Sequence, residues 1–292
     1  MPLSPEQLEF YNENGFIGPV EIIPPDEMAA LADSICDEIL IESEATRSVY
    51  GFHTNRDVHL FSQRVLRLAS HPNLVQNLVQ LLGPNIVFWR STVFHKPPQT
   101  ANLDATGNGF GDVDWHQGMD FITPALDLMT QKPSLGFSRA ENLKNFPLNI
   151  TAWIGIDEAT ELSGTLVFAP GSHRLGPVDY EKVVTAGGFN RTGFKSKYEG
   201  LFDTSKNVIV EVPAGSCILF NNLVYHKSLP NRTQKRRLGI ACRYVGSSVP
   251  VYPNGDPAGL DISSWNCVLI AGRNDAVANK SVKSVSEILG ES

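Results

Sequence analysis

Several features that mark particular classes of protein are scarce in this sequence. Only four of the 292 residues are cysteines, and no two of them form a CxxC pair. This pattern excludes the commonest thiolate metal sites and offers no disulfide framework, so we expect small buried thiols. The four are Cys36, Cys217, Cys242 and Cys267. The net charge of −7 argues against a nucleic-acid partner, which requires a basic face.

Long apolar runs are also missing. No stretch approaches the roughly 20 apolar residues that a membrane-spanning helix needs. The first ten residues, Met1–Phe10, carry neither the basic start nor the apolar centre of a secretory signal peptide. We therefore expect a cytoplasmic protein with no membrane partner.

What the sequence does contain is typical of a single globular domain spanning residues 1–292. Its residues are 42% hydrophobic and 19% charged, and a chain of this length buries most of its apolar surface without disulfides. The first part, to about residue 84, is expected to be helical. Ser4 and Pro5 form a helix start, and Asp26–Ile41 and His71–Leu82 have helical patterns.

From about residue 85 to 250 the composition becomes that of a β-rich core, and a C-terminal extension follows from about 251 to 292. Many short strands separated by Gly, Pro and Asn turns predict a sandwich or jelly roll, with the early helices outside. Pro97–Asp114 and Gly187–Asp203 are expected to be loops. The expected strands are Asn85–His95, Leu148–Ile156, Gly164–Phe168, Val208–Val212, Ser216–Phe220 and Leu238–Val245.

Two of the seven histidines have neighbours that suggest a metal site. His116 lies in Asp114–Gly118, and His226 lies far downstream at the end of a strand pair. Iron sites on β-barrels use two histidines and a carboxylate, with a His-x-Asp pair followed by a distant His. Arg237 follows His226, and its planar guanidinium suits the bidentate binding of a dicarboxylate cosubstrate. The other five histidines are interpreted as surface, turn or core residues.

With these residues in place, the sequence resembles the phytanoyl-CoA dioxygenase superfamily. Within it, the similarity is to the non-haem iron halogenases of the syringomycin threonyl chlorinase type, and it runs through most of the chain. The resemblance implies a mainly β fold with flanking helices, a double-stranded β-helix (jelly roll, cupin-like). The segments that carry it are Phe10–Pro19, Leu82–Asn85, Asp114–Gly118, Gly164–Leu166, Pro170–His173, Arg237–Gly239, Arg243–Val245 and Val251–Pro253.

The resemblance also implies a set of ligands. His116 and His226 are expected to hold Fe(II), and 2-oxoglutarate is expected to chelate the metal through its keto acid. Arg237 is expected to bind the far carboxylate of 2-oxoglutarate, with Thr151 and Trp153 nearby. Together with O2 these groups are the cofactors of a 2-oxoglutarate-dependent oxygenase.

Gly118 departs from most of the superfamily, which has Asp two residues after the first histidine. A glycine offers no side chain to the metal, so a position is left that an exogenous chloride can occupy. This change predicts halogenation of an unactivated aliphatic carbon rather than hydroxylation. The resemblance places Arg243 near the halide, and Thr123 stands where the chlorinase has Asn.

Two other functions remain open at this point. In a hydroxylase, native or carrying an engineered Asp-to-Gly change at Gly118, the iron would be completed by Asp120, by water or by another carboxylate. Reaching Asp120 would require the chain to bend, because residues four apart on a strand are about 13 Å apart, although Gly118 would permit such a bend. A non-catalytic binding protein on the same fold is the third hypothesis.

The substrate is expected to be an aminoacyl or acyl group tethered to a carrier protein, or a small metabolite. Carrier domains are acidic, so a basic surface would suit docking, and ordinary solvated charges are the alternative interpretation. The carbon attacked, the choice of chloride or bromide and the oligomeric state are not specified. The basic residues considered are Arg191, Lys195, Lys197, Arg232, Lys235 and Arg236.

Overall fold

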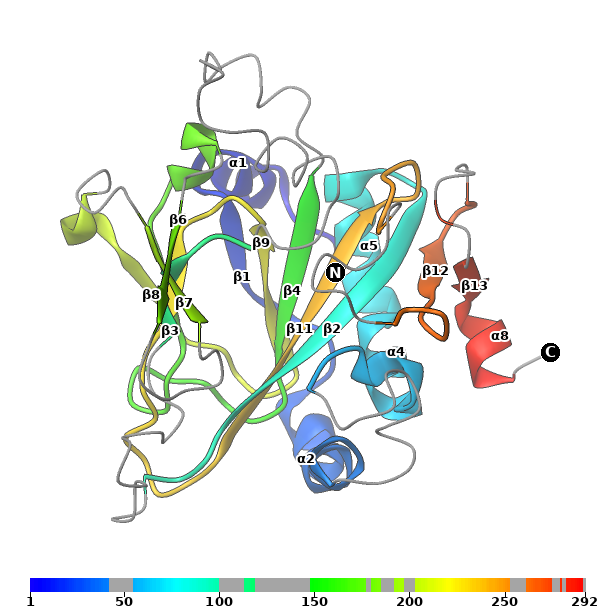
Figure 1. Ribbon diagram of the computed structural model, residues 1–292, viewed down its shortest axis with the longest axis horizontal. Coiled ribbons are helices and arrows are strands. Elements are labelled where there is room, and N and C mark those ends of the chain that lie inside the picture. The colour runs from blue at the N-terminus through cyan, green and yellow to red at the C-terminus, as the bar shows by residue number, and fades with distance from the viewer. Residues whose placement is uncertain are drawn as a thin grey trace.

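A computed structural model shows a β-barrel built of two facing sheets, with helices packed on the larger sheet (Figure 1). The structure describes residues 1–41, 55–99, 113–118, 148–176, 180–184, 192–196, 203–252, 261–274, 279 and 282–290. This architecture confirms the predicted mainly β jelly-roll class with flanking helices. Among the described residues no helix is both long and apolar enough to cross a membrane.

The described residues of the N-terminal part are mainly helical and include one strand. The helices are α1 (Pro5–Asn14), α2 (Pro25–Leu40), α4 (Gln63–Ala69) and α5 (Pro72–Leu82), with the 3-10 turn η1 (Val58–Leu60). Ser4 caps α1 in a capping box, and Gly15 ends it in the left-handed conformation. The strand β1 (Phe16–Glu21) lies inside the stretch expected to be helical, because its Phe16, Ile17 and Val20 pair with another strand.

The larger sheet has seven strands in the order β1-β9-β4-β11-β2-β12-β13. Its longest pairing joins β11 to β2, from Arg237 opposite Lys96 to Gly246 opposite Ile86, and Trp89 is the extra residue of a bulge. The remaining strands of this sheet are β2 (Ile86–Lys96), β4 (Asn149–Gly155), β9 (Ser216–Asn221), β11 (Arg237–Gly246), β12 (Cys267–Ala271) and β13 (Val282–Ser284).

The smaller sheet has the order β3-β10-β5-β8, and a separate hairpin is formed by β6 and β7. That hairpin corrects the expectation that Gly187–Asp203 is all loop, since β7 pairs with β6 along five residues of each strand. The short elements are β3 (Val113–His116), β5 (Leu166–Phe168), η2 (Ser172–Leu175), β6 (Tyr180–Val184), β7 (Thr192–Ser196), η3 (Thr204–Lys206), β8 (Val208–Val210), β10 (His226–Ser228) and α8 (Val285–Leu289).

Alternation along the strands of the larger sheet separates two environments. On β11, the side chains of Leu238, Ile240, Cys242 and Tyr244 join the main hydrophobic core on the helical side. The intervening residues face the smaller sheet, where Trp153 and Ala241 belong to a second core with aromatic side chains from both sheets. The interior of the barrel is therefore lined by the residues of one face, and it is there that the expected site residues lie.

Tyr244 links the larger sheet to the helical layer. Its buried hydroxyl donates a hydrogen bond of 2.8 Å to the carbonyl of Ala69, the last residue of α4. Carbonyls in a last helical turn have no partner within the helix, so this hydroxyl satisfies one of them. The buried hydroxyl of Tyr11 provides a natural comparison, because it has no hydrogen-bond partner among the described residues.

We expect Tyr244→Phe to lower the free energy of unfolding by about 1–3 kcal/mol, because a buried carbonyl loses its donor. Tyr11→Phe removes the same atom without breaking a bond, so its unfolding free energy should stay unchanged or rise slightly. Urea unfolding monitored by circular dichroism measures both. Equal losses in the two variants would contradict the role given to the Tyr244 hydroxyl.

Candidate active site

The two predicted iron ligands lie side by side on neighbouring strands of the smaller sheet. His116 ends β3 and His226 begins β10, and the antiparallel register sets them directly opposite each other. Their ring centroids are 4.2 Å apart, and the rings are tilted by 48°. Phe168 and Phe220 pack around His226, with ring centroids 5.8 Å and 4.7 Å away. The pair therefore lies in an apolar interior that is bounded by both sheets.

His226 is prepared to bind a metal through one particular nitrogen. Its Nδ1 is 2.9 Å from the carbonyl oxygen of Val224, and because a carbonyl only accepts, Nδ1 carries the proton. The second nitrogen, Nε2, is then the one with a lone pair. Burial lowers the pKa of His226 well below its ordinary value, and the charges of His116 and Arg243 lower it further. The neutral ring that results at pH 7 is the form that ligates metals.

The segment after His116 is fixed by contacts with the turn before β10. The buried Gln117 side chain donates hydrogen bonds to the carbonyls of Gly176 and Leu223, at 3.0 Å and 2.7 Å. The backbone N–H of Gly118 donates to the carbonyl of Asn222 at 2.7 Å. These bonds hold β3 and β10 in the register that brings the two histidines together. Gln117 did not figure in the sequence prediction, although it lies between two residues that did.

Neither the backbone nor the packing requires a glycine at position 118. Its φ angle lies outside the left-handed region that favours glycine. A Cβ atom added there would meet Asn222 at 3.6 Å or more, which is ordinary van der Waals contact. A Cβ atom is thus compatible with the described surroundings of Gly118. Nothing among the described residues explains why this position has no side chain.

Within the described ranges, no cluster of three or more His, Cys, Asp or Glu residues has the geometry to hold a metal. The histidine pair fits Fe(II), because imidazole nitrogen suits this metal and both rings come from adjacent, registered strands. Asp120 and Thr123, which the sequence made candidates for the metal and the halide surroundings, lie outside the described residues.

Arg237 is a buried cation held by neutral groups. It is 1% exposed, and its two terminal nitrogens donate to the carbonyls of Phe94 and Gly164 at 3.0 Å and 2.9 Å. Its Nε is buried and has no hydrogen-bond partner among the described residues. Burial lowers the pKa of Arg237 to about 10, against a smaller opposing effect of Asp157, so it remains charged at pH 7. A buried guanidinium of this kind fits a carboxylate ligand.

Of the two residues expected near Arg237, Trp153 lies beside its guanidinium, whereas Thr151 lies opposite Arg243 instead. Trp153 on β4 places its ring 5.3 Å from the Arg237 guanidinium carbon. Thr151, two residues earlier, is buried on the same face of β4 and is paired in register with Arg243. Trp153, in register with Ala241, therefore lies between the two arginines of β11, and Thr151 lies at the second of them.

Arg243 lies near enough to the histidines that its charge lowers the pKa of His226. One of its terminal nitrogens donates to the hydroxyl of Thr92 on β2 at 2.8 Å, which holds the guanidinium in place. Thr92 and Lys96 were not predicted from the sequence, although alternation along β2 could have indicated that both face the interior. The Lys96 ammonium donates to the Ser228 hydroxyl at 2.9 Å and to the carbonyl of Leu229.

If His226 is a ligand, His226→Ala should weaken Fe(II) binding by at least about 100-fold. Mutating a residue that only hydrogen-bonds to a metal ligand typically costs about 10–100-fold in metal affinity, and loss of the ligand itself should cost more. His95→Gln is the matched control, because His95 lies on the same long strand as Thr92 but is directed away from the site. Anaerobic equilibrium dialysis measures bound iron in both. Wild-type iron affinity in His226→Ala would show that this assignment is wrong.

Comparisons with known proteins identify the family and the fold of the chain. The family model of phytanoyl-CoA dioxygenase (PhyH) matches residues 11–239. The peroxisomal phytanoyl-CoA dioxygenase of Rattus norvegicus is 26% identical over 266 residues, which cover 84% of this chain and 69% of the relative. A probable alpha-ketoglutarate-dependent hypophosphite dioxygenase of Stutzerimonas stutzeri is 25% identical over 217 residues, covering 74% of this chain and 63% of the relative.

Solved structures share the fold. CytC3 with Fe(II) and alpha-ketoglutarate superposes with a TM-score of 0.65 at 23% identity, covering 97% of this chain and 94% of CytC3. The non-haem alpha-ketoglutarate-dependent carbocyclase SnoK gives a TM-score of 0.59 at 17% identity, with 88% and 89% of the two chains covered. The chain is thus an oxidoreductase that belongs to the phytanoyl-CoA dioxygenase (PhyH) family of Fe(II)- and 2-oxoglutarate-dependent oxygenases.

Proposed function

We propose that this protein is a 2-oxoglutarate-dependent halogenase that chlorinates an unactivated aliphatic carbon. The observation that carries the proposal is Gly118, which stands two residues after His116 although a Cβ atom would fit there. A hydroxylase of this family needs a carboxylate at that place to complete the metal site. A glycine that packing does not require is best explained by the need to leave room for a halide.

The residues around the histidine pair have separate tasks in this proposal. His116 and His226 hold the iron, with the Val224 carbonyl orienting the second ring. Arg237 binds the far carboxylate of 2-oxoglutarate, since it is a buried cation whose bonded neighbours are neutral carbonyls. The bound iron, with 2-oxoglutarate and O2, supplies the oxidising power that breaks an aliphatic C–H bond.

The positive charge of Arg243 suits a bound anion. Its guanidinium is fixed by Thr92 and is close enough to lower the pKa of His226. A cation at this place lowers the energy of a chloride beside the metal and does not compete as a ligand, because Arg carries no lone pair for a metal at neutral pH. In this proposal Gly118 leaves room for the chloride, and the positive charge of Arg243 attracts it.

Hydroxylation is the alternative function, and the names of the relatives favour it, since those compared above are dioxygenases. It would require another group at the place of the missing carboxylate, with Asp120 as the nearest candidate in the sequence. The two functions differ in a property that can be measured without knowing the substrate. A halogenase binds halide at the metal, whereas a hydroxylase is indifferent to halide.

As substrate we propose a small metabolite or an aminoacyl group on a carrier protein. Of the basic residues considered for carrier docking, Arg232 and Lys235 are exposed on the connection between β10 and β11. Arg236 is bound to two carboxylates and is not a free docking charge. The side chains of Arg191, Lys195 and Lys197 lie outside the described residues.

We expect chloride to shift the charge-transfer absorption band of the anaerobic Fe(II)–2-oxoglutarate protein with saturation. Gly118→Ala adds a Cβ without adding a ligand, so the shift should persist. Gly118→Asp should form the band but lose the chloride shift, because its carboxylate would take the halide position. Absence of any chloride response in the wild-type protein would favour hydroxylation, and a response that survives in Gly118→Asp would contradict the role of the vacancy.

A further inference from the structure

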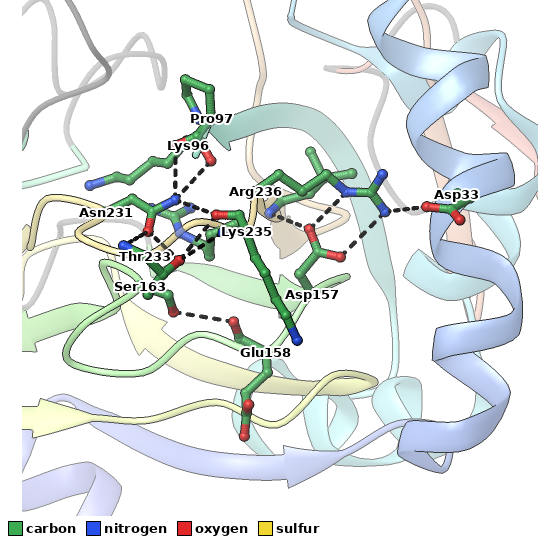
Figure 2. A network of polar contacts seen from close by, with 12 residues as sticks. Asp33, Lys96, Pro97, Asp157, Glu158, Ser163, Asn231, Thr233, Lys235 and Arg236 are labelled. Atoms are coloured by element: carbon green, nitrogen blue, oxygen red, sulfur yellow. Dashed lines mark hydrogen bonds and ion pairs between the residues drawn. The ribbon is translucent and has the colours of Figure 1, made fainter. Parts of the chain in front are cut away.

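Two consecutive arginines, Arg236 just before β11 and Arg237 as its first residue, have opposite surroundings. Arg237 turns into the barrel and is 1% exposed. Arg236 turns outward, where its side chain contacts Asp157 after β4 and Asp33 on α2 (Figure 2). Its Nε donates to the Asp157 carboxylate at 3.1 Å, and a terminal nitrogen lies 2.7 Å from the carboxylate of Asp33. Arg236 therefore forms ion pairs with two carboxylates.

Asp157 also holds the backbone next to Arg237. Both carboxylate oxygens of Asp157 accept from Arg236, and the one bound by the Arg236 Nε also accepts the N–H of Leu238 at 2.9 Å. In return, the backbone N–H groups of Ile156 and Asp157 donate to the carbonyl of Leu238, each at 3.0 Å. Arg237 therefore lies between a residue whose side chain binds Asp157 and a residue whose backbone binds Asp157.

The turn before Arg236 is equally well fixed. Asn231 donates from its side-chain amide to the carbonyls of Lys96, Pro97 and Lys235, and it accepts from Thr233 (Figure 2). The side chain of Lys235, by contrast, is exposed. Removing the charge of Lys235 would leave these turn contacts intact, because its backbone makes them.

The electrostatic consequence concerns Arg237. Asp157 is close enough that its charge raises the pKa of Arg237, although the effect of burial is larger. A carboxylate whose charge was not balanced would attract the same guanidinium that the cosubstrate needs, and it would repel the cosubstrate. For Arg236, burial alone would lower the pKa, yet its hydrogen bonds with Asp157 and Asp33 raise it above its ordinary value.

We propose that Arg236 is a positioning residue that neutralises Asp157, so that the buried guanidinium of Arg237 stays available for the far carboxylate of 2-oxoglutarate. This inference rests on the role proposed for Arg237. Arg236 then contributes to selectivity for 2-oxoglutarate although its side chain does not contact the cosubstrate. It also explains why an acidic residue is tolerated beside the anion-binding arginine.

The test compares two keto acids that differ at the far end. 2-Oxoglutarate carries the second carboxylate and 2-oxobutyrate does not. The ratio of their dissociation constants therefore measures how strongly that carboxylate interacts with Arg237. Both are titrated anaerobically into the Fe(II) protein and followed by the charge-transfer band. Arg236→Met should weaken 2-oxoglutarate about tenfold, the size of an ordinary coupling between charged neighbours, and leave 2-oxobutyrate unchanged.

A second substitution separates charge from structure. In the double variant Arg236→Met with Asp157→Asn, the amide oxygen still accepts from Leu238 but the negative charge is gone, so 2-oxoglutarate affinity should return to about the wild-type value. If Arg236 were only a structural tie, the double variant would bind no better than the single one. That result would overturn the proposal, as would wild-type selectivity in Arg236→Met.

Three controls complete the experiment. Lys235→Met removes a neighbouring exposed charge and should not change either affinity. Arg236→Lys keeps a charge opposite Asp157 and should bind 2-oxoglutarate nearly as the wild type does, which tests the proposal even if Arg236→Met does not fold. Arg237→Met should lose the preference for 2-oxoglutarate altogether. If it keeps that preference, the role of Arg237 itself is wrong, an outcome distinct from failure of Arg236 alone.

Discussion

The antiparallel pairing of β3 with β10 is the constraint on which the site depends. It sets His116 directly opposite His226, and because side chains alternate along a strand, a slip by one residue would turn one of the rings out of the barrel. Both strands are short, so the hydrogen bonds between them fix the register only weakly. The bonds of Gln117 and Gly118 to the turn before β10 supply the missing restraint. The two residues that follow His116 are therefore positioning elements.

The larger sheet contributes charge, and the smaller sheet contributes the histidine pair. Alternation along β11 places Arg237 and Arg243 on the interior face, while apolar residues between them pack against the helices. Each guanidinium is fixed by groups on β2 or beside β5. Asp157, the acidic residue next to Arg237, is balanced by Arg236. A barrel with two cations facing a pair of histidines is suited to anionic ligands.

The histidine pair and Arg237 were predictable because each lies in a short local pattern whose chemistry is restricted. The long strands were predictable for a similar reason, since their composition is locally biased toward β-branched and aromatic residues. Gln117, Thr92 and the pair Arg236–Asp157 were not, because their roles arise from contacts between residues far apart in the sequence. The strand β1 was missed because its pairing with β9 overrides the helical character of its neighbours.

The central claim is that the iron is held by two histidines and no carboxylate of this chain, with a halide in the remaining place. X-ray absorption at the iron edge of the anaerobic Fe(II)–2-oxoglutarate protein tests it most directly, with bromide added as a heavy analogue of chloride. The account predicts that bromide introduces a strong scatterer in the first coordination shell and that no other ligand of the chain is displaced. A shell of nitrogen and oxygen alone, unchanged by saturating bromide, would contradict it.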